Sequence, residues 1–130
     1  MKYLKQGTLQ ELCDMAVKAI VAQGGQSLNA RGECVPVSEC GTMKCAFSHC
    51  VDGDTSVGAD YHSTSWGVVD AWADRFELST EEKAVFQELQ FFHDCAYSGL
   101  RAEKAAELSS LGIDITSKYY QQWVEMGAIT

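Results

Sequence analysis

The residue types best suited to chemistry lie close together in one short segment. Four cysteines and a histidine occur between residues 34 and 50, namely Cys34, Cys40, Cys45, His49 and Cys50. Zinc prefers tetrahedral sites built from thiolate and imidazole ligands. The spacing is atypical, because common zinc motifs place paired ligands about two to four residues apart and this segment contains no Cys-x-x-Cys. A zinc-stabilised interaction module is therefore one alternative, beside reduced cysteines that pack as small apolar side chains.

A second group of reactive residues, His93-Asp94-Cys95, falls inside a segment with helical periodicity. Nucleophilic catalysis needs a thiolate beside a base, and a third group that orients the base. Successive helical residues point about 100° apart, so these three side chains cannot all converge on one substrate. His49 and Cys50 would point to opposite faces of a strand. We therefore predict no catalytic residue, expect His93 to border the core and Asp94 to face water, and rank a small hydrolase last.

Acidic residues outnumber basic residues in the chain. Aspartate and glutamate total 18, lysine and arginine total 10, and the formal net charge is −8. This balance argues against direct binding to a nucleic-acid phosphate backbone, which requires a surplus of positive charge. It suits either a solvated acidic face or a surface that docks on a basic partner. The predicted partner-binding residues are Asp70, Asp74, Glu77, Glu81, Glu82 and Glu88.

Apolar residues are spread through the chain rather than gathered in one long stretch. No run approaches the ~18 consecutive apolar residues that a membrane-spanning helix needs. The segment from Met1 to Gly7 lacks the apolar region of a secretory signal peptide. We therefore expect a cytosolic protein with reduced thiols, no bound cofactor and no membrane partner.

Two capping boxes mark the starts of the two most regular helices. Thr8 is followed by Glu11 at the third position, and Ser79 by Glu82, a pattern that satisfies free N–H groups at a helix start. Apolar residues then recur at helical spacing. Glycines such as Gly24 provide natural stops. The periodicity predicts five helices, at about residues 9–23, 66–75, 79–97, 101–109 and 115–126.

The cysteine-rich segment after the first helix has the pattern of a β-hairpin. Residues 33–38 and 42–47 are the predicted strands, with a turn at Gly41. Alternation places three apolar side chains on one face of the second strand: Met43, Cys45 and Phe47. Pro36 cannot donate a ladder hydrogen bond, so we expect the first strand at an edge. The predicted fold is therefore one α+β domain, residues 1–130, predominantly helical, with about five helices and a hairpin at about residues 33–47.

Short motifs follow one another in a definite order over about residues 8–96. They are Gln23-Gly24 with Ser27, Gly32-Glu33-Cys34, Gly41 with Lys44-Cys45-Ala46, and Leu89-Gln90 with His93-Asp94. This order resembles a family of small uncharacterised proteins encoded by tailed bacteriophages and prophages. The chain departs from that pattern at Val35-Pro36 and Ser48, and its additional thiols Cys40 and Cys50 place any metal inference from the family in doubt. The resemblance implies a phage or prophage origin and a location in the cytoplasm of a bacterial host. The family has no established activity that the resemblance would assign to this chain.

These features together predict a small acidic binding protein without catalytic activity. We expect it to engage and inhibit a host macromolecule that has a basic surface. A bacterial defence complex fits that description, which would make the chain an inhibitor of the anti-CRISPR or anti-restriction type. The alternatives are the zinc-stabilised interaction module and the small hydrolase.

Overall fold

The structure is a computed structural model that describes residues 3–38, 41–52, 68–73 and 76–130. Its helices are α1 (Leu9–Gln23), α2 (Ala46–His49), α3 (Val68–Ala73), α4 (Thr80–Asp94), α5 (Ser98–Ser110) and α6 (Lys118–Glu125). Its strands are β1 (Tyr3–Leu4) and β2 (Val51–Asp52), which pair antiparallel. The fold is α+β and predominantly helical, as predicted.

The two predicted capping boxes set the starts of α1 and α4. The Thr8 side chain accepts from the Glu11 N–H, and the Glu11 carboxylate accepts from the Thr8 N–H. Ser79 and Glu82 make the same pair of bonds at α4. α1 ends at Gly24, whose φ of +92° is a left-handed conformation that favours glycine. Local sequence therefore determines both ends of α1.

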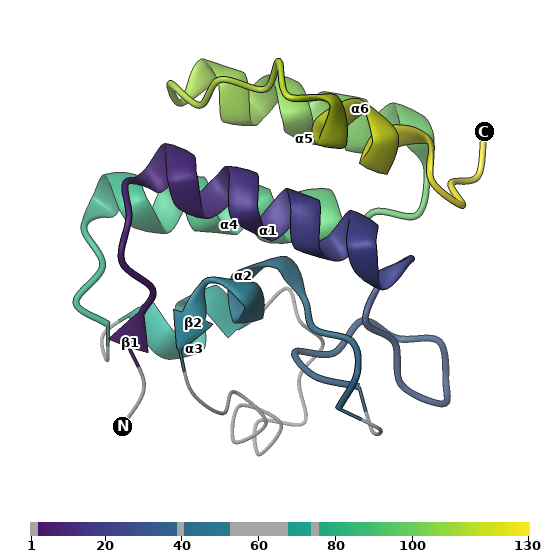
Figure 1. Cartoon of the computed structure of the whole chain (residues 1–130), viewed down its shortest axis with the longest axis horizontal. Coiled ribbons are helices and arrows are strands. Elements are labelled where there is room, and N and C mark those ends of the chain that lie inside the picture. The colour runs from purple at the N-terminus through teal and green to yellow at the C-terminus, as the bar shows by residue number, and fades with distance from the viewer. Residues whose placement is uncertain (1–2, 39–40, 53–67, 74–75) are drawn as a thin grey trace.

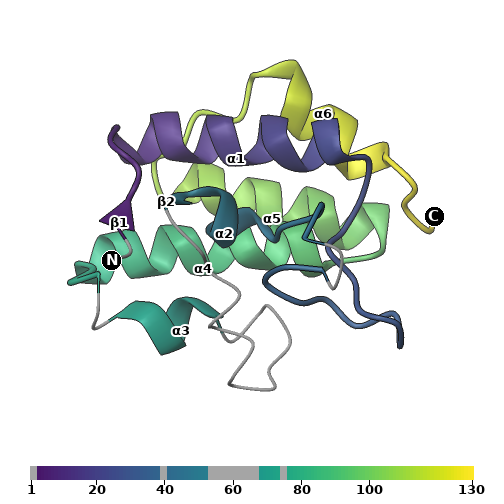
Figure 2. The ribbon, with the colours of Figure 1, turned by 60° about the horizontal axis from the view of Figure 1, so that its bottom comes forward.

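The helices are arranged in three layers (Figures 1 and 2). α1 and α4 lie in the middle, α5 and α6 cover one side, and α2 and α3 pack on the other side. The core between them is apolar, and its largest fully buried apolar side chains include Ile20, Phe47, Phe86, Leu89, Phe92, Leu108 and Trp123. The rings of Phe47 and Phe86 meet edge to face at 5.2 Å, which joins α2 to α4.

The predicted hairpin is only partly present, and its second strand is wrong from residue 46 onward. Val37 and Lys44 form one antiparallel bridge, and Gly41 makes the turn with a φ of +75°. The chain then enters α2, which the Cys45 side chain caps by accepting from the Ser48 N–H. The Phe47 N–H donates to the Gln90 side chain of α4 at 3.0 Å, so a contact distant in sequence takes the place of a ladder bond.

The first predicted strand lies between two partners rather than at an edge. On one side Cys34 bridges Leu28, and on the other side Val37 bridges Lys44. Pro36 sits between these two bridges, where its carbonyl accepts from the Cys45 N–H at 3.0 Å. Its missing N–H therefore interrupts neither bridge, which explains how proline is tolerated at a buried position.

The connection from α4 to α5 differs from the predicted boundaries at residues 97 and 101. α4 ends at Asp94, and Cys95 is already extended. The Ile129 N–H donates to Ala96 O and the Ser98 N–H donates to Ile129 O, both at 2.9 Å. Pairing with the C-terminal segment thus holds the chain extended where helical periodicity alone would continue α4.

Candidate functional site

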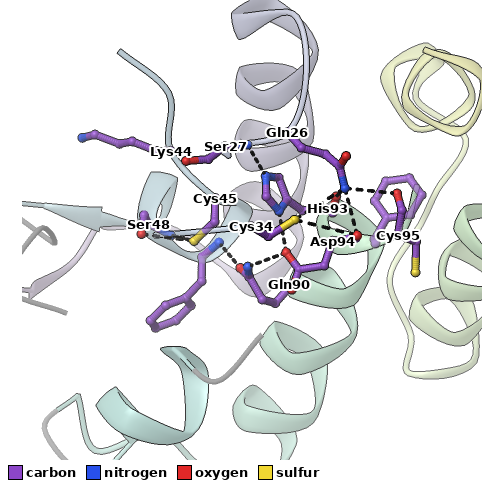
Figure 3. Close-up of polar contacts among 12 residues, drawn as sticks. Gln26, Ser27, Cys34, Lys44, Cys45, Ser48, Gln90, His93, Asp94 and Cys95 are labelled. Atoms are coloured by element: carbon purple, nitrogen blue, oxygen red, sulfur yellow. Dashed lines mark hydrogen bonds and ion pairs between the residues drawn. The ribbon is translucent and has the colours of Figure 1, made fainter. Parts of the chain in front are cut away.

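A group of polar side chains is enclosed where the loop after α1 meets the C-terminal end of α4 (Figure 3). Several of them are fully buried, and buried polar groups are stable only when they are hydrogen-bonded. In Figure 3 the side chains from the loop and from α4 point toward one another. We call this group the His93 cluster, and its members are Gln26, Ser27, Cys34, Gln90, His93 and Asp94.

His93 is the centre of the cluster, and its side chain is fully buried. Its Nε2 lies 3.0 Å from the backbone N of Ser27, and its Nδ1 lies 2.7 Å from Asp94 Oδ1. Because a backbone N–H can only donate, Nε2 must accept, and the ring proton is therefore on Nδ1, where it is donated to Asp94. These contacts assign one neutral tautomer to His93 and engage both of its ring nitrogens.

Asp94 corrects the expectation that this residue faces water. Its side chain is only 14% exposed and turns back onto the His93 ring. The same Oδ1 accepts from Gln90 Nε2 at 3.1 Å, and Gln90 in turn accepts from the Phe47 N–H. Asp94 is the last residue of α4, and one helical turn separates it from Gln90, which allows the side chains to meet. The carboxylate therefore links the histidine to α2 through one glutamine.

The Gln26 and Cys34 side chains close the cluster from the loop. Gln26 Nε2 lies 2.8 Å from Asp94 O and 3.1 Å from His93 O, so it satisfies carbonyls that α4 leaves without helical partners. The same nitrogen lies 3.6 Å from Cys34 Sγ, and the Cys34 thiol donates to Asp94 O at 3.8 Å. The Gln26 and Cys34 side chains thereby hold the loop against the C-terminal end of α4.

A stack of three side chains supports the other side of His93. The Trp123 ring is parallel to His93, with an interplanar angle of 6° and centroids 5.9 Å apart. The Arg101 guanidinium lies over Trp123 at 4.4 Å from the ring centroid. Trp123 Nε1 also donates to Phe92 O at 2.7 Å. This stack fixes the plane of the imidazole and connects α4, α5 and α6.

The predicted zinc ligands are not brought together among the residues that the structure describes. Cys45 caps α2, Cys50 donates to carbonyls of Leu12 and Ala46, and the His49 ring lies 2.9 Å from Gln23 Oε1. Burial raises the pKa of Cys45 to about 11 and raises the pKa of Cys50 well above its ordinary value, so neither thiol favours the thiolate that zinc binds. Only Cys34 belongs to a cluster of metal-ligating side chains, and Cys40 lies outside the described residues.

The stability of the protein is expected to fall as the pH is lowered from about 6.5 to 4 because of His49. Burial, followed by the nearby charges of Lys44 and Lys5, lowers the pKa of His49 from 6.5 to about 4. In this range the unfolded chain binds a proton that the folded chain excludes, so acid favours unfolding by about 1–2 kcal/mol. Urea denaturation at stepwise pH values measures the loss. His49→Gln keeps an amide donor for Gln23 and should reduce the slope, while an unchanged slope would contradict the assignment.

The geometry of the cluster does not support thiol catalysis. A catalytic histidine needs a ring nitrogen that can take the proton of the nucleophile. In His93, Nε2 accepts from the Ser27 N–H and Nδ1 carries the proton donated to Asp94. Neither nitrogen is available to Cys34. The cluster is therefore arranged to hold the loop and not to activate a nucleophile.

The predicted acidic surface divides into neutralised and exposed parts. Asp70 forms a salt bridge with Lys83 at 3.1 Å, Glu88 forms one with Lys104 at 3.3 Å, and Glu82 completes the cap of α4. Glu77 and Glu81 are exposed near the start of α4, and Asp74 lies outside the described residues. Within the described part of the region, the exposed charge is therefore concentrated at the junction of α3 and α4.

Sequence reasoning missed Gln26 and Ser27 as members of the cluster. Two polar residues after a helix-ending glycine are common in loops, so Gln26 and Ser27 carry no distinctive signal. The one sequence feature that pointed to this segment was the motif that contains Ser27.

No helix among the described residues is both long and apolar enough to cross a membrane. Comparisons of the chain with protein-family models, with curated proteins and with solved structures find no match.

Proposed function

We propose that the chain is a small binding protein of a tailed phage or prophage that acts in the cytoplasm of a bacterial host. It engages and inhibits a host macromolecule with a basic surface, such as a defence complex of the CRISPR or restriction type. The order of sequence motifs supports the viral origin. The observation that carries the binding role is the exposed acidity at the α3–α4 junction in a chain of net charge −8.

The charges at this junction are suited to long-range attraction. Glu77 and Glu81 are exposed, and the side chain of Asp70 is 64% exposed although it is paired with Lys83. Salt bridges between exposed groups are weak and are readily exchanged for a partner's cations. Negative patches accelerate association with a basic surface and exclude acidic competitors. The internal engagement of His93 supports binding rather than catalysis as the role of this chain.

Reversing Glu77 and Glu81 to lysine is expected to weaken binding to the partner by about tenfold at low salt. The immobilised protein would first capture its partner from a bacterial lysate, and mass spectrometry would identify it. Affinity would then be measured with the purified partner at two salt concentrations. The wild-type complex should weaken at high salt, because dissolved ions screen the attraction between exposed charges of opposite sign.

The matched control reverses Glu103 and Glu107 to lysine. Both residues are exposed on α5, so the double variant changes the net charge equally at a different surface. Binding should survive this change nearly intact. An equal loss in both double variants would show that overall charge alone matters, and the α3–α4 junction would then not be the contact. Failure to retain any salt-sensitive partner would overturn the binding role itself.

A further inference from the structure

Three side chains of different ligand type converge in the His93 cluster. Cys34, His93 and Asp94 each offer one ligand atom, and these atoms all lie within 4.8 Å of one another. Among the described residues, this is the one group of three or more such side chains. His93 is buried, whereas Cys34 and Asp94 are partly accessible, so an ion could enter from their side.

We propose that Cys34 Sγ, His93 Nδ1 and Asp94 Oδ1 bind one divalent cation of the zinc class. Thiolate, imidazole and carboxylate form a ligand set that suits zinc and does not suit magnesium or calcium, which prefer oxygen alone. One thiolate and one carboxylate neutralise a divalent charge, as a poorly hydrated site requires. A fourth tetrahedral position would be taken by water.

Ion binding displaces the protons that two of the ligand atoms carry in the metal-free protein. One proton lies on Nδ1 between His93 and Asp94, and another lies on the Cys34 thiol. Binding forms bonds from the ion to sulfur, nitrogen and oxygen, and the thiol proton leaves to water. The imidazole stays neutral, because its proton moves from Nδ1 to Nε2. No electron is transferred.

This proton shift changes the contact between His93 and the loop. In the metal-free form, Nε2 accepts from the Ser27 N–H at 3.0 Å. When Nε2 carries the proton, two donors face each other and the bond is lost. Another acceptor, such as a backbone carbonyl of the loop or a water molecule, then takes the place of the Ser27 N–H, as is usual for metal-bound histidines. Cation binding therefore alters the loop that holds Ser27, which distinguishes this site from weak binding at surface carboxylates.

The test is a titration of the reduced 130-residue chain with Co²⁺, followed by displacement with Zn²⁺. Cobalt bound to a thiolate gives a near-ultraviolet charge-transfer band that carboxylate binding does not give. The band should appear at one equivalent, disappear with Zn²⁺ and be absent from Cys34→Ser. Cys95→Ser is the matched control, because Cys95 is a partly buried thiol at the same end of α4 and is not in the ligand group.

Nuclear magnetic resonance supplies the second measurement. Addition of Zn²⁺ should shift the Ser27 amide resonance, and Asp94→Asn should weaken binding at least tenfold while circular dichroism shows an unchanged fold. The absence of a thiolate band at micromolar Co²⁺ would overturn the proposal. A band that persists in Cys34→Ser, or a Ser27 amide that does not respond to bound Zn²⁺, would also overturn it. None of these results depends on the exposed acidic residues at the α3–α4 junction, so this test and the test of the proposed function can fail independently.

Discussion

Trp123→Ala is expected to lower the free energy of unfolding by about 4 kcal/mol, the largest effect of any single substitution considered for this chain. The indole is fully buried, stacks on His93, lies under Arg101 and donates to Phe92 O. Alanine removes all of these contacts and leaves a cavity between α4 and α6. Urea denaturation followed by far-ultraviolet circular dichroism would measure the change.

Trp123→Phe separates packing from the hydrogen bond of the indole. Phenylalanine retains much of the apolar contact with His93 but cannot donate to the Phe92 carbonyl, so a loss of about 1–2 kcal/mol is expected. If the alanine variant lost less than about 1 kcal/mol, the stack would contribute little and the plane of His93 would be set by its hydrogen bonds alone.

Arg101→Met is expected to lower the free energy of unfolding by about 3 kcal/mol. Arg101 is only 2% exposed, and its guanidinium donates at 2.7 Å to the carbonyls of Cys95, Trp123 and Met126. Those carbonyls belong to the C-terminal ends of α4 and α6, where cations are stabilised by the helix dipole. Methionine fills a similar volume but leaves three acceptors with no donor from this side chain.

Arg101→Lys is the companion variant for the same measurement. Lysine keeps the positive charge but cannot present the planar fork that reaches carbonyls of two helices at once. An intermediate loss of about 1–2 kcal/mol would therefore show that geometry contributes beyond charge. If the lysine variant were as stable as the wild type, the hydrogen bonds of the planar guanidinium to carbonyls of two helices would add nothing beyond the positive charge.

Local sequence predicted the helices well because their signals act over a few residues. The capping boxes at Thr8 and Ser79 satisfy backbone groups within one turn, so they determine where α1 and α4 begin regardless of the rest of the chain. The end of α4 was misplaced because Ala96 pairs with Ile129, a residue far along the chain. Phe47 was wrongly assigned to a strand because its N–H donates to Gln90, which is 43 residues away in sequence. No local pattern indicates such a contact.

The His93 cluster could be predicted only in part. His93-Asp94 was recognised as a reactive pair, and Cys34 was recognised as a metal-ligand type, but they were assigned to separate groups. Ser27 and His93 are 66 residues apart in sequence, and no periodicity or spacing rule relates such positions. The expectation for Asp94 failed because helical spacing describes the direction of the Cα–Cβ bond. Rotation of the side chain at the last residue of α4 returned the carboxylate to its neighbour.

The position of α6 late in the chain has a consequence for how the protein is made. Tyr120 of α6 donates to Asp14 of α1 at 2.9 Å, and Trp123 of α6 covers His93 of α4. A ribosome synthesises α1 and α4 before α6, so the apolar surfaces that α6 covers stay exposed on the nascent chain until α6 emerges. The core between these helices is therefore completed only after α6 has been synthesised.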